Sequence, residues 1–223
     1  MSDYALSVLK TLFEENRNAQ NAEAMEKYMK NHFPFLGIKK PLRAELEKKF
    51  YTQTGMAKEP FQEGFVHTLW EMPEREYQYA ALGYLEKFSK KLGPDDLGLL
   101  EELITTKSWW DTVDALAAKP VGILGAKFPD TIPAEMDKWA VSDNMWLRRT
   151  AILYQLKFKK KTDEQRLYSY MNQNADSKEF FIQKAIGWAL REYSKTNPDS
   201  VKEFIESTEL AALSRREGSK YLS

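Results

Sequence analysis

The stretch SDNMWLRRTAILYQLK, residues 142–157, decides the fold, because similar helix-sized phrases recur along the chain. Aligned on a small residue, the copies are REYQYAALGYL at Ala80, WDTVDALAA at Ala115, WLRRTAILYQL at Ala151, FIQKAIGWAL at Ala185 and RREGSKYL at Gly218. Successive copies are 35, 36, 34 and 33 residues apart. A period in this range is typical of stacked helical pairs, so the sequence predicts an all-α helical-repeat solenoid with one long concave surface.

The composition fits this interpretation. Gly (10) and Pro (9) are sparse, while Lys and Glu are abundant, which favours helices throughout. No low-complexity linker or change of composition divides the chain, so we expect one domain over residues 1–223. The sequence contains no Cys, which excludes disulfides and thiolate zinc sites. The two histidines, His32 and His67, make a metal site or a Ser-His-Asp triad improbable, so we predict no metal and no cofactor.

The residues before each repeated phrase resemble helix starts. Pro73, Ser108, Asp143 and Ser177 stand seven or eight residues before the aligned small residue. Proline is favoured at a first helical position, and Ser or Asp at an N-cap. Ser108 and Asp111 also fit a capping box. The N-terminal segment is an acidic amphipathic helix rather than a signal peptide, and no apolar stretch is long enough for a membrane span, so we expect a cytoplasmic protein.

Placing side chains on the repeated helix at 100° per residue gathers an unusual set on one side. Offsets −1, −2, −5 and +3 from the small residue fall within an arc of about 140°, and offset +6 joins it. This arc contains Trp110, Asp114, Trp146, Arg149, Lys157, Phe180, Lys184, Trp188 and Arg191. A buried face does not collect unpaired charges, and a solvent face does not collect tryptophans. A ligand groove accounts for both.

Each of these residues also has a purely structural interpretation. Trp110 and Trp188 are each as readily explained as core residues. Asp114 lies beyond the first turn of its helix, and a salt bridge to a neighbouring repeat, for example to Arg149, would explain it without any ligand. The 33 basic and 33 acidic residues argue against a protein that binds nucleic acid over its whole surface, but they allow a basic groove backed by an acidic face.

Several long phrases give the chain a resemblance to a known family. They are YMKNHF (28–33), LWEMPEREYQYAAL (69–82), LLEELITTKSWWDTVD (99–114), SDNMWLRRTAILYQLK (142–157) and SKEFFIQKAIGWALREYSKTNPD (177–199). Through them nearly the whole chain resembles the AlkD family of bacterial alkylpurine DNA glycosylases, which are built from HEAT-like repeats. The resemblance implies an active site formed by Trp110, Asp114, Arg149 and Trp188. It also implies recognition from the DNA backbone without a deep base pocket.

The resemblance therefore predicts an enzyme that hydrolyses the N-glycosidic bond of cationic N3- or N7-alkylated purines, such as 3-methyladenine and 7-methylguanine, in duplex DNA. Asp114 would stabilise the sugar cation and orient water, and Arg149 would clamp a phosphate. The predicted DNA contacts are Tyr28, Arg148, Lys157, Lys184 and Arg191. Arg148 departs from the family, which often has a neutral polar residue there. We expect a monofunctional, monomeric enzyme. The alternative is a non-catalytic HEAT-repeat module that binds DNA or protein through the same groove.

Overall fold

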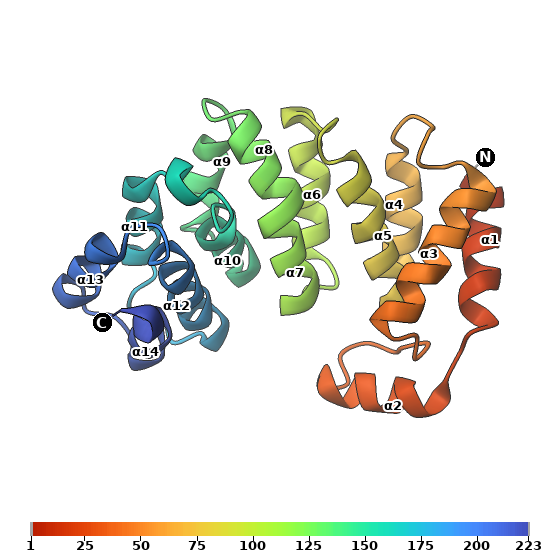
Figure 1. The fold of residues 1–223 in the computed structure, drawn as a ribbon, viewed down its shortest axis with the longest axis horizontal. Helices are drawn as coiled ribbons and strands as arrows, with labels where there is room; N and C mark the ends of the chain where they lie inside the picture. Colours follow the sequence, from red (N-terminus) through yellow and green to blue (C-terminus); the bar gives the residue numbers. More distant parts are fainter. Residues whose placement is uncertain (1, 223) are drawn as a thin grey trace. The chain divides into compact units, whose positions relative to one another are not determined.

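The computed structural model describes residues 2–222, and side chains from residue 3 onward. Every regular element in this range is helical (Figure 1), which confirms the all-α class. The chain forms two compact units, Met1–Phe88 and Ser89–Ser223. In the described part of the chain, no helix is both long enough and apolar enough to cross a membrane. The single domain over 1–223 stays a prediction.

In the N-terminal unit, one helix binds the backbone of the long loop that joins the second and third helices. Its helices are α1 (Ser2–Glu14), α2 (Ala19–Tyr28), α3 (Lys40–Thr54), α4 (Glu63–Glu71) and α5 (Arg75–Phe88). Glu76 of α5 is fully buried, and its carboxylate accepts hydrogen bonds of 2.9–3.0 Å from the backbone N–H groups of residues 36–38. Gly37 in this loop has φ +87°, and a Cβ there would lie 2.0 Å from the carbonyl oxygen of Asn18. The charged carboxylate thus ties the loop between α2 and α3 to α5.

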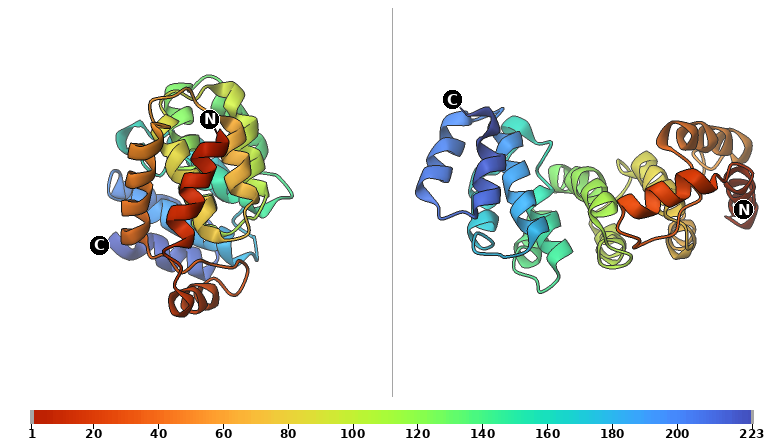
Figure 2. Two further views of the ribbon diagram at one scale, coloured as in Figure 1. Left: turned by 90° about the vertical axis from the view of Figure 1, so that its right-hand side faces the viewer. Right: turned by 90° about the horizontal axis from the view of Figure 1, so that it is seen from below.

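The C-terminal unit contains the rest of the repeat. Its elements are η1 (Pro94–Asp96), α6 (Leu97–Thr105), α7 (Trp110–Leu116), η2 (Ala117–Val121), α8 (Gly122–Lys127), α9 (Ile132–Trp139), α10 (Met145–Leu153), η3 (Lys159–Lys161), α11 (Glu164–Asn172), α12 (Phe180–Tyr193), α13 (Pro198–Ser207), α14 (Ala212–Gly218) and η4 (Ser219–Tyr221). Along this unit the helices run from green to blue, and the C-terminal helix α14 packs against α12 (Figure 2). The π-helical turn η2 contains Pro120, which lacks a backbone N–H, and it joins α7 to α8.

The predicted repeat is confirmed. The aligned phrases fall on α5, α7, α10, α12 and α14, and the partner helices lie between them. Ala80, Ala151 and Ala185 are buried, and a Cβ on Gly218 would lie 3.0 Å from the side chain of Leu190. Ala115 is the exception, since it is only half-buried. Small residues at these positions allow neighbouring repeats to pack closely.

The predicted helix starts are wrong by one or two residues. Helix α5 begins at Arg75, so Pro73 is not its first residue. Ser108 is not an N-cap: α7 is preceded by Trp109, and the Ser108 hydroxyl instead donates to the carbonyl of Ile104 at 2.6 Å, so the capping box with Asp111 does not form. Asn144, rather than Asp143, caps α10 by accepting from the N–H of Trp146 at 2.9 Å. Glu179 precedes α12, not Ser177. Each start lies later than predicted because tertiary packing, not the first capping residue, sets where the chain turns into the helix.

Candidate active site

Three repeat helices of the C-terminal unit meet at one ion pair. Arg149 on α10 directs its Nε to Oδ1 of Asp114 at 2.7 Å and its Nη2 to Oδ2 at 2.9 Å, with Asp114 on α7. The remaining nitrogen, Nη1, donates to the backbone carbonyl of Phe181 on α12. The guanidinium therefore joins α7, α10 and α12 through charge-assisted and backbone hydrogen bonds.

The pair is largely withdrawn from solvent. The Arg149 side chain is 5% exposed, whereas that of Asp114 is 16% exposed. Burial raises the pKa of the Asp114 carboxyl above its ordinary value, and the hydrogen bonds and charge of Arg149 only partly offset this effect. Asp111 nearby acts in the same direction as burial. Asp114 is thus a partly accessible carboxylate that is more basic than a surface aspartate, and perturbed carboxyls of this kind are often found at functional sites.

Two tryptophans lie on the helix faces that carry the pair. Trp110 precedes Asp114 by four residues on α7, which places both on the same side of the helix. Trp188 follows Phe181 by seven residues on α12, two turns along the face whose carbonyl holds Arg149. Both indoles are half-buried, so neither is the plain core residue of the structural interpretation. The structure therefore brings Asp114 and Arg149 into contact. Trp110 shares a helix side with Asp114, and Trp188 lies on α12, the helix whose Phe181 carbonyl binds Arg149.

A cluster of aromatic rings supports the site from one side. The ring of Trp109 lies 5.8 Å from Trp146 and 5.0 Å from Phe181, and Trp146 lies 5.1 Å from Phe181. The Arg149 guanidinium carbon is 5.7 Å from the Phe181 ring centroid. These edge-to-face and tilted contacts hold α7, α10 and α12 in register at the level of the ion pair. The sequence predicted Trp146 to face a ligand, whereas in the structure it packs in this aromatic cluster.

The predicted DNA contacts have varied surroundings. Lys157 is exposed, and Arg148 donates to the carbonyl oxygens of Ser142 at 2.8 Å and Asp143 at 3.4 Å, closing the turn before α10. Lys184 and Arg191 both lie against Glu217 of α14, at 3.4 and 2.8 Å. Sequence reasoning missed Glu217 and its other partner, Lys220, although both belong to the repeated phrase RREGSKYL.

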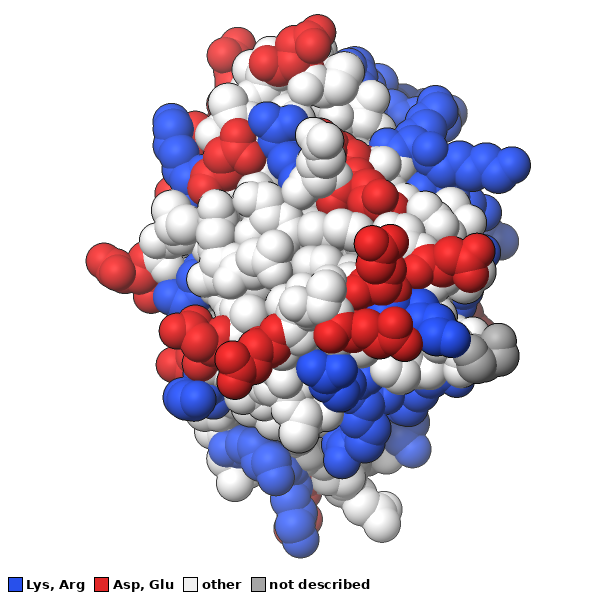
Figure 3. Space-filling view, turned by 90° about the vertical axis from the view of Figure 1, so that its left-hand side faces the viewer, with Lys and Arg blue, Asp and Glu red and all other residues white. Residues whose placement is uncertain are grey.

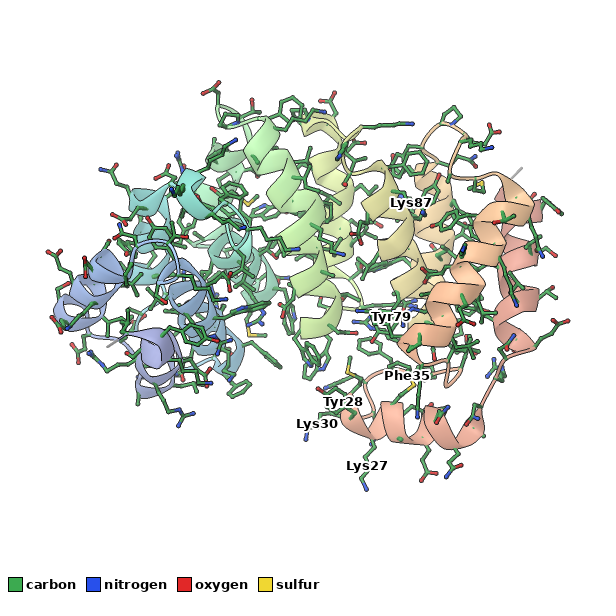
Figure 4. All side chains as sticks on the ribbon, in the orientation of Figure 1. Lys27, Tyr28, Lys30, Phe35, Tyr79 and Lys87 are labelled. Atoms are coloured by element: carbon green, nitrogen blue, oxygen red, sulfur yellow. The ribbon has the colours of Figure 1, made fainter. Side chains whose placement is uncertain are left out.

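Tyr28 belongs to the N-terminal unit. It lies at the end of α2, is 71% exposed, and stands between Lys27 and Lys30 in the sequence (Figure 4). Lys30 has φ +57°, a left-handed conformation that ends the helix. An exposed tyrosine between two lysines suits contact with a nucleic-acid backbone, and the flanking lysines were also missed from the sequence.

Charges are unevenly distributed on the face shown in Figure 3. Lys and Arg side chains gather along its right-hand and lower margins, while Asp and Glu form a band across the middle. Among the described residues, no three His, Asp or Glu side chains are grouped so as to hold a metal ion.

The fold and the site together define a class: helical-repeat proteins that present a carboxylate–guanidinium pair and tryptophans on their repeat helices. The chain belongs to the DNA alkylation repair enzyme family, whose profile matches residues 9–222. A comparison with curated protein sequences gave no match.

Three solved structures are similar to the chain. A predicted DNA alkylation repair enzyme from Enterococcus faecalis is 34% identical, with a TM-score of 0.87 over 93% of this chain and 97% of that one. AlkD2 from Streptococcus mutans is 18% identical, with a TM-score of 0.61 over 82% and 99% of the two chains. The protein smu.31 from Streptococcus mutans UA159 is also 18% identical, with a TM-score of 0.60 over 81% and 98%. At 18% identity, the last two support the fold alone.

Proposed function

We propose that the protein is a monofunctional DNA glycosylase that removes cationic N3- and N7-alkylated purines from duplex DNA. The observation that carries this proposal is the half-buried Asp114 carboxylate, which Arg149 holds through two hydrogen bonds. Asp114 lies on the same side of α7 as Trp110. Membership of the DNA alkylation repair enzyme family supports the substrate class. We also expect the enzyme to act as a cytoplasmic monomer without a metal or cofactor.

The proposed reaction needs an electrostatic stabiliser more than a strong acid. An alkylated purine carries a positive charge, so when the N-glycosidic bond breaks, its electron pair neutralises the departing base. The deoxyribose becomes cationic at C1′, and a water oxygen then bonds to that carbon and loses a proton. In the proposed mechanism, Asp114 stabilises the sugar cation and accepts a hydrogen bond or the proton from this water. The raised pKa of the Asp114 carboxyl strengthens it as a proton acceptor.

Arg149 has a different part in this mechanism from the phosphate clamp that the resemblance implies. Its Nε, Nη1 and Nη2 donate to Asp114 and Phe181, and its side chain is only 5% exposed. We therefore infer that Arg149 orients the Asp114 carboxylate and stabilises its ionised form. Trp110 and Trp188 would bring their ring faces to the cationic base or sugar, through interactions of about 0.5–2 kcal/mol each.

The test replaces Asp114 by Asn, which keeps the shape and removes the charge. We expect Asp114→Asn to bind a methylated duplex at least as tightly as the wild type but to release no 3-methyladenine or 7-methylguanine. The matched control is Asp137→Asn, because Asp137 is also paired with an arginine in the same unit, at 3.0 and 3.1 Å from Arg166, but lies on α9. Asp137→Asn should release base at the wild-type rate. Equal release by Asp114→Asn and the wild type would refute the catalytic role.

The non-catalytic module remains the other candidate. It would bind DNA through the same residues, but the wild-type protein would release no base. Incubating N-methylated duplex DNA with the wild type and assaying free bases separates the two. Addition of EDTA should leave the release unchanged, in line with the expected absence of a metal.

A further inference from the structure

Three cations of the C-terminal unit converge on one carboxylate. Glu217 on α14 lies 2.8 Å from Nη1 of Arg191, 3.0 Å from Nζ of Lys220 and 3.4 Å from Nζ of Lys184. Its side chain is 11% exposed, whereas those of Lys184 and Lys220 are 39% and 49% exposed. The group has three positive charges and one negative charge, so it remains cationic and faces solvent through its lysines.

This cluster is continuous with the candidate active site. Lys184 and Arg191 lie four residues before and three residues after Trp188 on α12. At 100° per residue, all three side chains fall within an arc of about 60° on one side of the helix. The two cations therefore flank Trp188 along the face that also supplies the Phe181 carbonyl to Arg149.

Glycine allows α14 to come close enough to form the cluster. A Cβ on Gly187 would lie 2.6 Å from Cβ of Glu217 and 3.1 Å from the carbonyl oxygen of Ser214. The Ser214 hydroxyl also donates to the carbonyl of Gln183 at 2.9 Å, which holds α14 to α12 beside this contact. The residue next to Trp188 must therefore be glycine for Glu217 to reach the two cations of α12.

The cations keep donors for a ligand while they contact Glu217. An ammonium carries three N–H donors and a guanidinium five. Lys184, Arg191 and Lys220 each make one contact with Glu217, and together they leave several donors on the exposed side. Hydrogen bonds from Lys or Arg to phosphate oxygens are charge-assisted and stronger than neutral ones, so convergent cationic donors suit a phosphate.

We propose that Lys184, Arg191 and Lys220 form a binding site for a DNA backbone phosphate next to Trp188, and that Glu217 is the positioning residue that holds them together. Helix α14 is then part of the DNA-binding surface as well as a packing partner of α12. This inference rests on the proposed contact with duplex DNA. It adds two residues, Glu217 and Lys220, and the docking of α14 to that contact.

The test measures binding of an undamaged duplex by fluorescence anisotropy as a function of salt. Each phosphate contact contributes about 0.9 to the slope of log K against log salt concentration. Lys220→Ala should lower this slope by about 0.9, so that between 50 and 200 mM salt the wild type loses about 3.5-fold more affinity than the variant. The control is Lys138→Ala, because Lys138 also pairs with a glutamate in this unit, Glu135 at 2.7 Å, but on α9. Its slope should equal that of the wild type. A wild-type slope for Lys220→Ala would overturn the phosphate site.

Glu217→Gln tests the positioning role through the sign of its effect. Removing a negative charge near DNA strengthens binding if Glu217 only repels phosphate. If Glu217 holds the three cations in place, the variant should bind about threefold more weakly, because their side chains must be ordered on binding. Tighter binding would overturn the positioning role. Thermal unfolding of the variant checks that α14 stays docked.

The result is separable from that of the proposed function. Undamaged DNA binding does not require base release. Release of base together with an unchanged salt slope for Lys220→Ala would refute the phosphate site alone. A lowered slope without any release of base by the wild type would refute the glycosylase alone.

Discussion

Replacing Arg149 by Met tests how much the ion pair that joins α7, α10 and α12 stabilises the folded protein. The substitution keeps an unbranched side chain that can pack against Phe181, but it removes three hydrogen bonds, two to Asp114 and one to the Phe181 carbonyl. It also leaves the Asp114 carboxylate, whose side chain is only 16% exposed, without its counter-ion. The expected loss combines broken charge-assisted bonds with an uncompensated, partly buried charge.

The magnitude follows from this geometry. Removing one partner of a buried ion pair costs about 3–5 kcal/mol. Asp114 keeps some contact with water and can take up a proton, so the lower end applies and we expect a loss of about 3 kcal/mol. For a chain of this size, each kcal/mol lowers the melting temperature by about 2–4 °C, so Arg149→Met should melt about 10 °C below the wild type.

Calorimetry or circular dichroism at pH 7 measures the change. The matched control is Arg166→Met, which breaks bonds of 3.0–3.1 Å to Asp137 and Asp163 at a more exposed pair. Exposed pairs contribute about 0–1 kcal/mol, so this control should melt within about 3 °C of the wild type. If Arg149→Met loses no more stability than Arg166→Met, the reasoning about the buried pair is wrong.

Two further predictions concern pH and packing. Because burial raises the pKa of the Asp114 carboxyl, the rate of base release should fall with decreasing pH at a higher pH than the pKa of an ordinary aspartate would give. The pH–rate profile of the control variant Asp137→Asn should fall at the same pH as that of the wild type. The same shift makes the native state bind the Asp114 proton more tightly than the unfolded chain, so this carboxyl should favour folding most at low pH and lose that contribution as pH rises, which pH-dependent unfolding of Asp114→Asn checks by difference. Gly187→Ala should lower stability by about 1–3 kcal/mol by pushing α14 away, whereas Gly98→Ala, where nothing lies within 4 Å of the new Cβ, should raise it by about 0.5–1 kcal/mol; urea unfolding of both variants decides.

Periodicity alone was sufficient to predict the repeat and the residues that share a helix face. Trp110 and Asp114 lie one turn apart on any helix, so their common side follows from the spacing. The same holds for Lys184, Trp188 and Arg191 on α12. Helix starts were less predictable, as Ser108 shows: a hydroxyl can cap the following helix or bond back to the preceding one, and here it bonds to Ile104.

The partners of the charged residues could not be derived from spacing. The sequence left open whether Asp114 faces a ligand or a salt bridge, and the structure shows the bridge to Arg149 in a site that is still 16% exposed at the carboxylate. The role of Glu217 could not be predicted, because a glutamate near the end of a charged phrase is usually solvated. Only the docking of α14 brings it to Lys184 and Arg191.

The sequence by itself determined the helical repeat, which residues share one side of a helix, and the resemblance that suggests a reaction. The first two depend on the periodicity of the α-helix, which is local and independent of the rest of the chain, whereas the resemblance depends on particular long phrases. The tertiary structure decided which charges meet: Arg149 with Asp114, and Glu217 with three cations. The reason is physical, since an ion pair between repeats forms only when packing across helices brings two side chains within a few ångströms and removes them from water.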